Sequence, residues 1–320
     1  MENYQGKRVA RGRRTALLLI AAAVVMTAAA AVLIYQKYWD KTPPSEPDSS
    51  SPAESALQSA SGREPAPGAS LDLTPEPKAP VYDFSQPAPE GNAVDNSYFD
   101  DAAFVGDSRT DGFMLYSGIG TGENLTSNGL STFRLAEKKA LTINGEKYTL
   151  LEALALKEYG KVYLSLGINE LGYGSKNDNS FYSSYCAAID EIRRLQPDAV
   201  IYIQGLIPLN EKQIEEYNGN KYNLTNDHLR TFNELLRQAA EEKQVVYLDL
   251  YTEFADESGA LPEEDSRDGV HLKREPCKRW LDYLKTHTVD FNALYPDGPP
   301  MPEPAEPATD ITAADGSGQG

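Results

Sequence analysis

The sequence predicts one doubly wound α/β domain with a parallel β-sheet, preceded by one transmembrane helix. Two observations predict the domain. Short apolar runs rich in β-branched and aromatic residues recur along the chain, and longer stretches with apolar residues at helical spacing separate them. A third observation, one long uncharged run near the N-terminus, predicts the transmembrane helix.

The uncharged run covers Thr15 to Tyr35, and a helix of this length reaches about 30 Å, the thickness of a bilayer core. Residues 1–14 form a basic arm with five Lys and Arg residues, so the positive-inside rule leaves the N-terminus in the cytoplasm. The alternative is a signal peptide cleaved among Ala28–Ala31, but apolar residues Val32–Ile34 continue past that site. We therefore expect an uncleaved signal anchor, and a chain that lies outside the cytoplasm beyond it.

Two segments have the composition of disordered chain. Residues 36–95 are rich in Pro, Ser, Ala and Glu and predict a disordered spacer, and residues 291–320 predict a disordered acidic tail. The domain is expected between them, at residues 96–290, which carry 21 Lys and Arg against 32 Asp and Glu, a net charge of −11. Such a domain repels nucleic acid, so we expect no nucleic-acid partner.

The elements of the domain follow in order. Buried parallel strands are expected at residues 102–106, 161–167, 199–208 and 245–250. Helices are expected over the stretches LLEALALKEY, FYSSYCAAIDEIRRLQPD, NDHLRTFNELLRQAAEEK and KRWLDYLKTHT. Thr149 and Glu152 form a capping box that opens the first of these helices, and Asn144-Gly145 predicts the turn of a hairpin just before it.

Two polar residues follow apolar strands of the expected sheet. Ser108 comes after the strand at residues 102–106, and Asn169 comes after the strand at residues 161–167. In doubly wound sheets the functional crevice lies at the carboxyl ends of the strands, so both side chains are expected on one edge. A serine needs a base before it acts as a nucleophile.

Three histidines could supply that base. His228 lies at the start of a helix, and His287 lies near the end of another, where a histidine is an ordinary partner of the helix dipole. His271 lies in a loop three residues after Asp268, a spacing that lets a turn place the carboxylate against the imidazole. The sequence therefore favours His271 as the base and Asp268 as its orienting acid.

The stretches GDS (106–108), GINE (167–170) and DGVH (268–271) occur in that order, and with them the chain resembles the SGNH (GDSL-like) hydrolase family. It is most similar to bacterial membrane-anchored members whose first block reads GDSR. The resemblance implies a flavodoxin-like three-layer α/β/α sandwich. The resemblance covers the domain and no part of the anchor. The uncharged run behind the basic arm separately predicts a localisation in the bacterial cell membrane, with one pass and the catalytic domain outside the cytoplasm.

The resemblance also assigns roles, carried over by residue. Ser108 would be the nucleophile, His271 the general base and Asp268 the acid that orients it. The oxyanion hole would consist of the Ser108 backbone N–H, the Asn169 side chain and a glycine N–H. Gly129 is our first choice for that glycine, with Gly120 or Gly122 as alternatives.

Three neighbours of these residues receive simpler interpretations. Arg109 stands where the family has leucine, and we interpret it as a surface charge, with a place beside the pocket as the alternative. Asp107 is interpreted as a hydrogen-bonding residue of the turn, and Glu170 as a brace of the Asn169 loop.

Several other features leave more than one interpretation open. Four aromatic residues, Tyr173, Phe181, Tyr182 and Tyr185, either rim a sugar-binding cleft or belong to a loop and an amphipathic helix, which we prefer. The polar insertion at residues 210–227 is a candidate lid. Cys186 and Cys277 have no metal-site spacing, and we expect two buried free thiols rather than a disulfide.

The combined interpretation is a membrane-tethered serine esterase that needs no metal or cofactor and forms an acyl-enzyme on Ser108. The expected partner is acylated cell-surface carbohydrate or another small acyl ester, with acetyl groups first. Acyl transfer to a surface glycan and lysophospholipase-like lipid hydrolysis are the alternatives. A non-catalytic binding module is disfavoured because serine, asparagine, aspartate and histidine occur together, and a metal hydrolase because the histidines are scattered.

Overall fold

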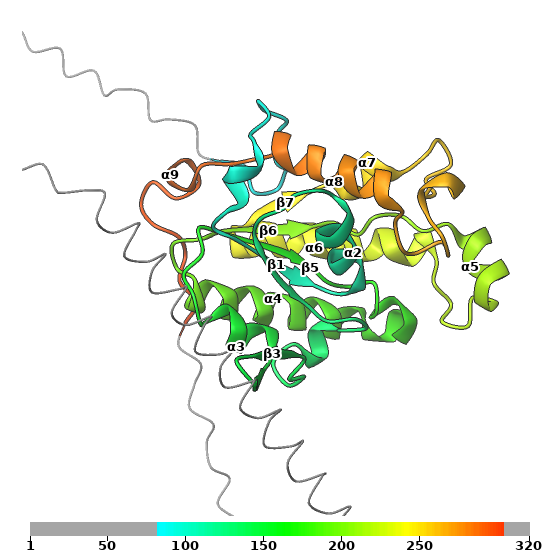
Figure 1. Cartoon of the computed structure of the whole chain (residues 1–320), viewed down its shortest axis with the longest axis horizontal. Helices are drawn as coiled ribbons and strands as arrows, with labels where there is room; N and C mark the ends of the chain where they lie inside the picture. The colour runs from blue at the N-terminus through cyan, green and yellow to red at the C-terminus, as the bar shows by residue number, and fades with distance from the viewer. Residues whose placement is uncertain (1–81, 304–320) are drawn as a thin grey trace, which may run out of the picture. The chain divides into compact units, whose positions relative to one another are not determined.

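The computed structural model describes residues 82–303, and their central element is a parallel β-sheet (Figure 1). Its strands are β1 (Ala102–Gly106), β2 (Glu123–Thr126), β5 (Lys161–Ser165), β6 (Val200–Gln204) and β7 (Val246–Leu248). They are ordered β2-β1-β5-β6-β7, and every neighbouring pair is parallel. Counted along the chain, this is the 2-1-3-4-5 order of flavodoxin-like folds, with its switch point between β1 and β5. The parallel α/β fold expected from the sequence is confirmed.

Helices cover both faces of the sheet and complete three layers (Figure 1). The core on one face includes α3 (Leu150–Leu154), α4 (Asp178–Leu195), α5 (Glu211–Asn218) and α6 (Asn226–Lys243). The core on the other face includes α2 (Ser108–Tyr116), α7 (Leu250–Phe254), α8 (Arg274–Thr286) and α9 (Phe291–Leu294).

Alternate strand residues enter the two cores, which explains why the central strands read as continuous apolar runs. Val105 of β1 and Leu164 of β5 face the α4 side. On the α8 side the rings of Phe104, Tyr163 and Tyr202 stack across three strands, with centroids 4.9 and 4.6 Å apart.

Two local predictions are confirmed in detail. Strands β3 (Leu141–Ile143) and β4 (Glu146–Tyr148) form an antiparallel hairpin. Asn144 and Gly145 both have positive φ, as a two-residue type I′ turn requires. Thr149 and Glu152 form the expected reciprocal capping box at the start of α3.

Two elements differ from the prediction. Strand β2, with the sequence ENLT, was not expected, because it is an edge strand with one buried side chain and no apolar run. Helix α3 ends at Leu154 rather than continuing to Tyr159. The buried Gln196 side chain donates to the Leu154 and Lys157 carbonyls and accepts from the Tyr159 N–H, so a tertiary contact satisfies this backbone in place of a longer helix.

The expected domain boundaries at residues 96 and 290 were too narrow, and residues 82–95 and 291–303 were wrongly assigned to disordered segments. On the N-terminal side, the Ala88 N–H donates to the Tyr247 carbonyl at 2.8 Å and Ala88 is buried. On the C-terminal side, Tyr295 is buried and its hydroxyl accepts from Arg193 at 3.0 Å. Both residues belong to the hydrophobic core on the α8 side of the sheet, so the domain extends beyond residues 96–290.

The expected anchor at Thr15–Tyr35, the spacer at residues 36–81 and the end of the tail at residues 304–320 lie outside the described residues. Between residues 82 and 303, no helix has the length and apolar character needed to cross a membrane.

Candidate active site

The first strand ends directly in the first residue of a helix, and this junction presents Ser108. Asp107 caps α2, because its carboxylate accepts from the Arg109 N–H at 2.9 Å. Gly106 is required at the junction, since a Cβ there would lie 2.1 Å from Thr110 Oγ1 and 2.8 Å from the Ser165 carbonyl oxygen. As the first helical residue, Ser108 has a backbone N–H with no acceptor inside the helix.

The structure brings Ser108, His271 and Asp268 into one chain of hydrogen bonds. Ser108 Oγ lies 2.9 Å from His271 Nε2, and His271 Nδ1 lies 2.8 Å from Asp268 Oδ2. Because an ionised carboxylate only accepts, Nδ1 carries the proton and Nε2 accepts from the serine hydroxyl. This is the arrangement of a nucleophile, a general base and an orienting acid.

Asp268 is itself fixed by the loop that it starts. Its Oδ1 accepts from the N–H groups of Val270 and His271 at 3.0 and 2.8 Å. Burial alone would raise the pKa of Asp268, but the hydrogen bonds from His271 outweigh it and hold this pKa well below its usual value. Asp268 is therefore ionised whenever His271 needs a partner.

The same loop requires a glycine and a neighbouring helix. Gly269 has φ +84°, and a Cβ there would lie 2.3 Å from the Asn210 carbonyl oxygen and 2.6 Å from the Ile214 side chain. The Asn210 N–H donates to the Gly269 carbonyl at 2.9 Å. The polar insertion considered as a lid thus packs its helix α5 against the back of the His271 loop.

Arg109 is buried, so its interpretation as a surface charge is wrong. Only 6% of its surface is exposed, and its guanidinium donates to the carbonyls of Val270, Ile207 and Pro208 at 2.8, 2.8 and 3.3 Å. Burial lowers the pKa of Arg109 to about 10, which leaves it charged at neutral pH. Arg109 directly follows Ser108, and its hydrogen bond to the Val270 carbonyl connects it with the residue that precedes His271.

Asn169 lies beside the serine, at the edge where β5 ends. Its side-chain amide donates to the Leu130 carbonyl at 2.9 Å and to Asp107 Oδ2 at 3.2 Å. Ser108 and Asn169 were expected on one edge of the sheet, and the contact of Asn169 with Asp107, the residue before the serine, agrees with this. The contact with Leu130 could not be read from the sequence, because β2 itself was not recognised.

The position of Gly129 fits the expected second block better than the two alternatives. Strand β2 ends at Thr126 beside Gly106 of β1, and Gly129 lies in the turn that follows. Among the described residues, no acceptor takes its N–H. Gly120 and Gly122 precede β2 and therefore lie at the opposite edge of the sheet.

Glu170 joins the loops after β2 and β5. It is 1% exposed, and its Oε1 accepts from the Thr132 N–H at 2.5 Å, which agrees with its interpretation as a brace. Burial raises the pKa of Glu170 to about 7 and that of Asp107 to about 6. Two carboxyl groups with raised pKa values thus adjoin Asn169: Asp107 accepts from its amide, and Glu170 is the next residue.

The remaining histidines and cysteines lie elsewhere. His228 Nε2 is 2.8 Å from Asp178 Oδ1 and connects the starts of α6 and α4, while His287 ends α8. Cys186 and Cys277 are buried free thiols, as expected, and they belong to the cores on opposite faces of the sheet. Within residues 82–303, no cluster of metal-ligating side chains is found.

The four aromatic residues considered for a sugar cleft separate into two groups. Phe181 and Tyr185 are fully buried, and the Tyr182 hydroxyl donates to Glu242 at 2.5 Å. These three belong to the amphipathic helix α4, as preferred. Tyr173 alone is exposed, on the loop that follows Asn169.

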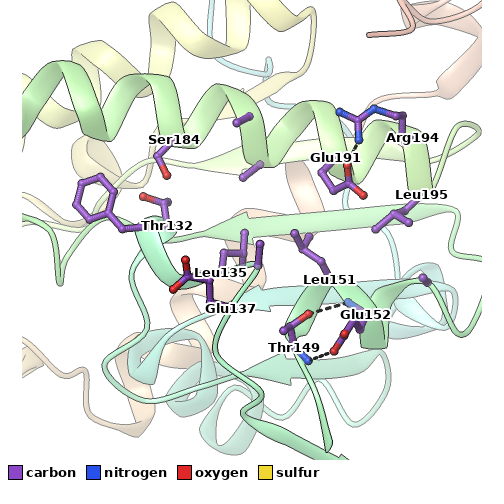
Figure 2. A pocket seen from close by; sticks show the side chains of 15 residues that line it. Thr132, Leu135, Glu137, Thr149, Leu151, Glu152, Ser184, Glu191, Arg194 and Leu195 are labelled. Carbon is purple, nitrogen blue, oxygen red and sulfur yellow. Dashed lines mark hydrogen bonds and ion pairs between the residues drawn. The ribbon is translucent and has the colours of Figure 1, made fainter. Parts of the chain in front are cut away.

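A cavity of about 680 Å³ opens between α3, the segment after Leu130, and α4 (Figure 2). Leu135, Leu151 and Leu195 line it, and Arg194 pairs with Glu191 at its rim. Its lining includes neither Ser108 nor His271. An enclosed space of about 10 Å³ lies between Asp107, Arg109 and Trp280, and its lining also includes neither Ser108 nor His271.

Comparison with protein families gives one match. Residues 104–275 match the model of the GDSL-like lipase/acylhydrolase family. A search of curated proteins found no match.

Solved structures with a similar fold include a protein from Streptococcus pneumonia provisionally described as a platelet activating factor. It is 24% identical, over 60% of this chain and 83% of that chain, with a TM-score of 0.48. A GDSL-like lipase from Bacteroides thetaiotaomicron is 12% identical over 60% and 86%, with a TM-score of 0.43. An acetyl xylan esterase is 14% identical over 59% and 99%, with a TM-score of 0.41.

The family model covers more than half of the chain and includes the GDS, GINE and DGVH stretches. The chain is therefore an ester hydrolase that belongs to the GDSL-like lipase/acylhydrolase family, the SGNH hydrolases.

Proposed function

We propose that this chain removes small acyl groups, acetyl groups first, from cell-surface carbohydrate through an acyl-enzyme on Ser108. The observation that carries the proposal is the chain of hydrogen bonds from Ser108 through His271 to Asp268. These three residues are the proposed catalytic residues, as the sequence predicts.

Acylation starts when Ser108 Oγ attacks the ester carbonyl and His271 Nε2 takes its proton. The imidazolium that forms is stabilised by the ionised Asp268, and it then protonates the leaving alcohol oxygen as the tetrahedral intermediate collapses. Water, activated by the same His271, attacks the acyl-enzyme in the second half of the reaction and releases the carboxylic acid.

The oxyanion of each tetrahedral intermediate would be bound by the N–H groups of Ser108 and Gly129 and by the Asn169 amide. Both amide protons of Asn169 have acceptors in this structure, so the oxyanion would replace the longer of the two contacts, to Asp107. Each well-placed donor contributes about 3 kcal/mol to lowering the barrier.

The preference for small acyl groups rests on the sequence, in which no large apolar run marks a groove for an acyl chain. In the structure the side chain of His271 is half exposed to solvent. We further propose that the Thr15–Tyr35 segment anchors the domain outside the cytoplasm, which would place it near acylated surface glycans.

The proposal is tested with the full-length chain in detergent and p-nitrophenyl esters of increasing acyl length. Activity that is highest with acetate, persists in a metal chelator and disappears after fluorophosphonate labelling of Ser108 is expected. Full activity without labelling at Ser108 would exclude the acyl-enzyme, and a preference for octanoate would move the substrate toward lipids.

A further inference from the structure

Two aromatic side chains, one half-buried and one exposed, lie on the loops that hold Asn169. Phe133 belongs to the short helix η2 (Thr132–Arg134) and Tyr173 to η3 (Leu171–Tyr173), and their ring centroids are 5.9 Å apart with planes inclined by 52°. Tyr173 is 56% exposed. A single exposed aromatic side chain is ordinary, but several that lie together on one surface can mark a ligand-binding site.

The two loops are joined firmly to each other and to the site. Asn169 donates to the Leu130 carbonyl, three residues before Phe133, and the Thr132 N–H donates to Glu170, three residues before Tyr173. The same hydrogen bonds that position Asn169, the proposed oxyanion donor, therefore also hold the loops that carry the two rings.

A third aromatic residue lies near this pair. Tyr222, from the segment between α5 and α6, is 55% exposed. Its Cβ lies close to the backbone of Gly172, the residue before Tyr173, since a Cβ on Gly172 would lie 3.6 Å from it. The Lys221 ammonium lies 4.7 Å from the centre of the Tyr222 ring. The ammonium lies over one face of that ring and brings hydrogen-bond donors beside it.

The chemistry of this surface fits a sugar ring. Aromatic faces carry negative charge density that attracts the C–H groups on one side of a pyranose, and nearby polar groups can bind its hydroxyls. The chain carries a net charge of −18, which disfavours anionic lipids and phosphate polymers.

We propose that Phe133, Tyr173 and Tyr222 form an aromatic platform that binds a neutral pyranose ring of the ester's alcohol part. The inference rests on the proposed function, because it places the sugar next to an acyl group held at Ser108 and Asn169. It makes the alcohol, rather than the acyl group, the part of the substrate that this chain selects.

The kinetic test compares two substrates in the full-length protein, O-acetylated chitotetraose and p-nitrophenyl acetate, which has no sugar. Tyr173→Ala and Tyr222→Ala should each lower kcat/KM for the oligosaccharide about tenfold, mainly through KM, and leave kcat/KM for p-nitrophenyl acetate unchanged. Tyr173→Trp, which keeps an aromatic ring, should retain the wild-type kcat/KM for the oligosaccharide. The control is Tyr217→Ala, which removes a 70% exposed tyrosine on α5 and should change neither substrate.

A binding test separates this inference from the proposed function. Calorimetric titration of the Ser108→Ala protein with unmodified chitotetraose should show binding that the Ser108→Ala, Tyr173→Ala protein weakens about tenfold. If the wild type hydrolysed neither ester, the proposed function would be wrong. The titration would still show whether Tyr173 contributes to sugar binding. Equal binding by the two proteins, equal losses on both esters, or a loss confined to p-nitrophenyl octanoate would overturn the platform.

Discussion

Ser108 and His271 are 163 positions apart in the chain and within hydrogen-bonding distance in the fold. Because they act through one proton, we expect Ser108→Ala and His271→Ala each to lower kcat for p-nitrophenyl acetate by several orders of magnitude. Asp268→Ala should lower it less, since Asp268 orients the imidazole and exchanges no proton. The double variant Ser108→Ala, His271→Ala should be no slower than either single one.

Steady-state kinetics on the four proteins, with circular dichroism to confirm folding, tests this unit. Asn169→Ala belongs to the same series and should cost on the order of 10² to 10³ in kcat with little change in KM, because it binds the oxyanion and not the resting ester. Unchanged esterase activity in Ser108→Ala would show that Ser108 is not the nucleophile and only links β1 to α2.

Arg109 was expected at the surface and is buried in the structure. Its guanidinium satisfies three carbonyls, one of them beside His271, and each buried carbonyl left unpaired costs about 1–3 kcal/mol. Arg109→Leu should therefore lower kcat at least tenfold with a smaller change in KM, because the His271 loop loses its tether. Arg109→Lys should retain part of the rate.

The matched control is Arg134→Leu, which removes an exposed arginine of η2 and should leave kcat unchanged. Thermal melts identify any variant that has unfolded. An Arg109→Leu protein that folds and keeps the wild-type kcat would show that the loop holds its position without the guanidinium.

At the scale of elements, the site depends on loops that follow different strands and on the groups that join them. The loop after β5 carries Asn169, the turn after β2 carries Gly129, and Glu170 connects the two regions through Thr132. The loop before α8 carries His271 and is held from behind by α5.

The buried contact of Glu170 with the Thr132 N–H should make the free energy of unfolding depend on pH. Because burial raises the pKa of Glu170 from 4.5 to about 7, the unfolded chain loses this proton before the folded chain does. The free energy of unfolding therefore falls as pH rises from about 4.5 to 7 and is level above that range. At about 1.4 kcal/mol per pH unit, the effect is at most roughly 3 kcal/mol.

Glu170→Gln keeps an acceptor for the Thr132 N–H and removes the titration. Relative to the wild type, it should gain stability between pH 5 and pH 8, as measured by urea unfolding at both values. Asp268, whose pKa is lowered, gains its stability at lower pH and adds no slope in this window. Glu137→Gln, at an exposed position, is the control, and a pH slope in Glu170→Gln equal to that of the wild type would contradict the assignment.

At the scale of the whole molecule, the uncharged Thr15–Tyr35 segment behind five basic residues predicts that the folded domain lies outside the cytoplasm. Protease added to intact protoplasts that express the chain should remove the domain and leave the N-terminal segment protected. A cytoplasmic protein in the same cells serves as the control for lysis. Release of the domain into the medium with a new N-terminus near Ala31 would instead show a cleaved signal peptide.

The sequence by itself determined what depends on neighbouring residues or on burial from both sides. The Asn144-Gly145 hairpin and the Thr149–Glu152 capping box follow from local backbone chemistry. The strands β1, β5, β6 and β7 follow from apolar runs that both cores require. Ser108, Asn169 and the pair Asp268 and His271 could be named because parallel strands end at one edge, and because the motifs resemble a known family.

Tertiary structure alone decided what depends on distant contacts. The edge strand β2 exists because β1 pairs with it, and α3 stops where Gln196 takes its carbonyls. Arg109 is buried because three carbonyls far along the chain surround its guanidinium, and a charged residue after a serine carries no sign of this. The aromatic platform likewise joins side chains from three segments, since exposure and adjacency are properties of the packed molecule and not of any local pattern.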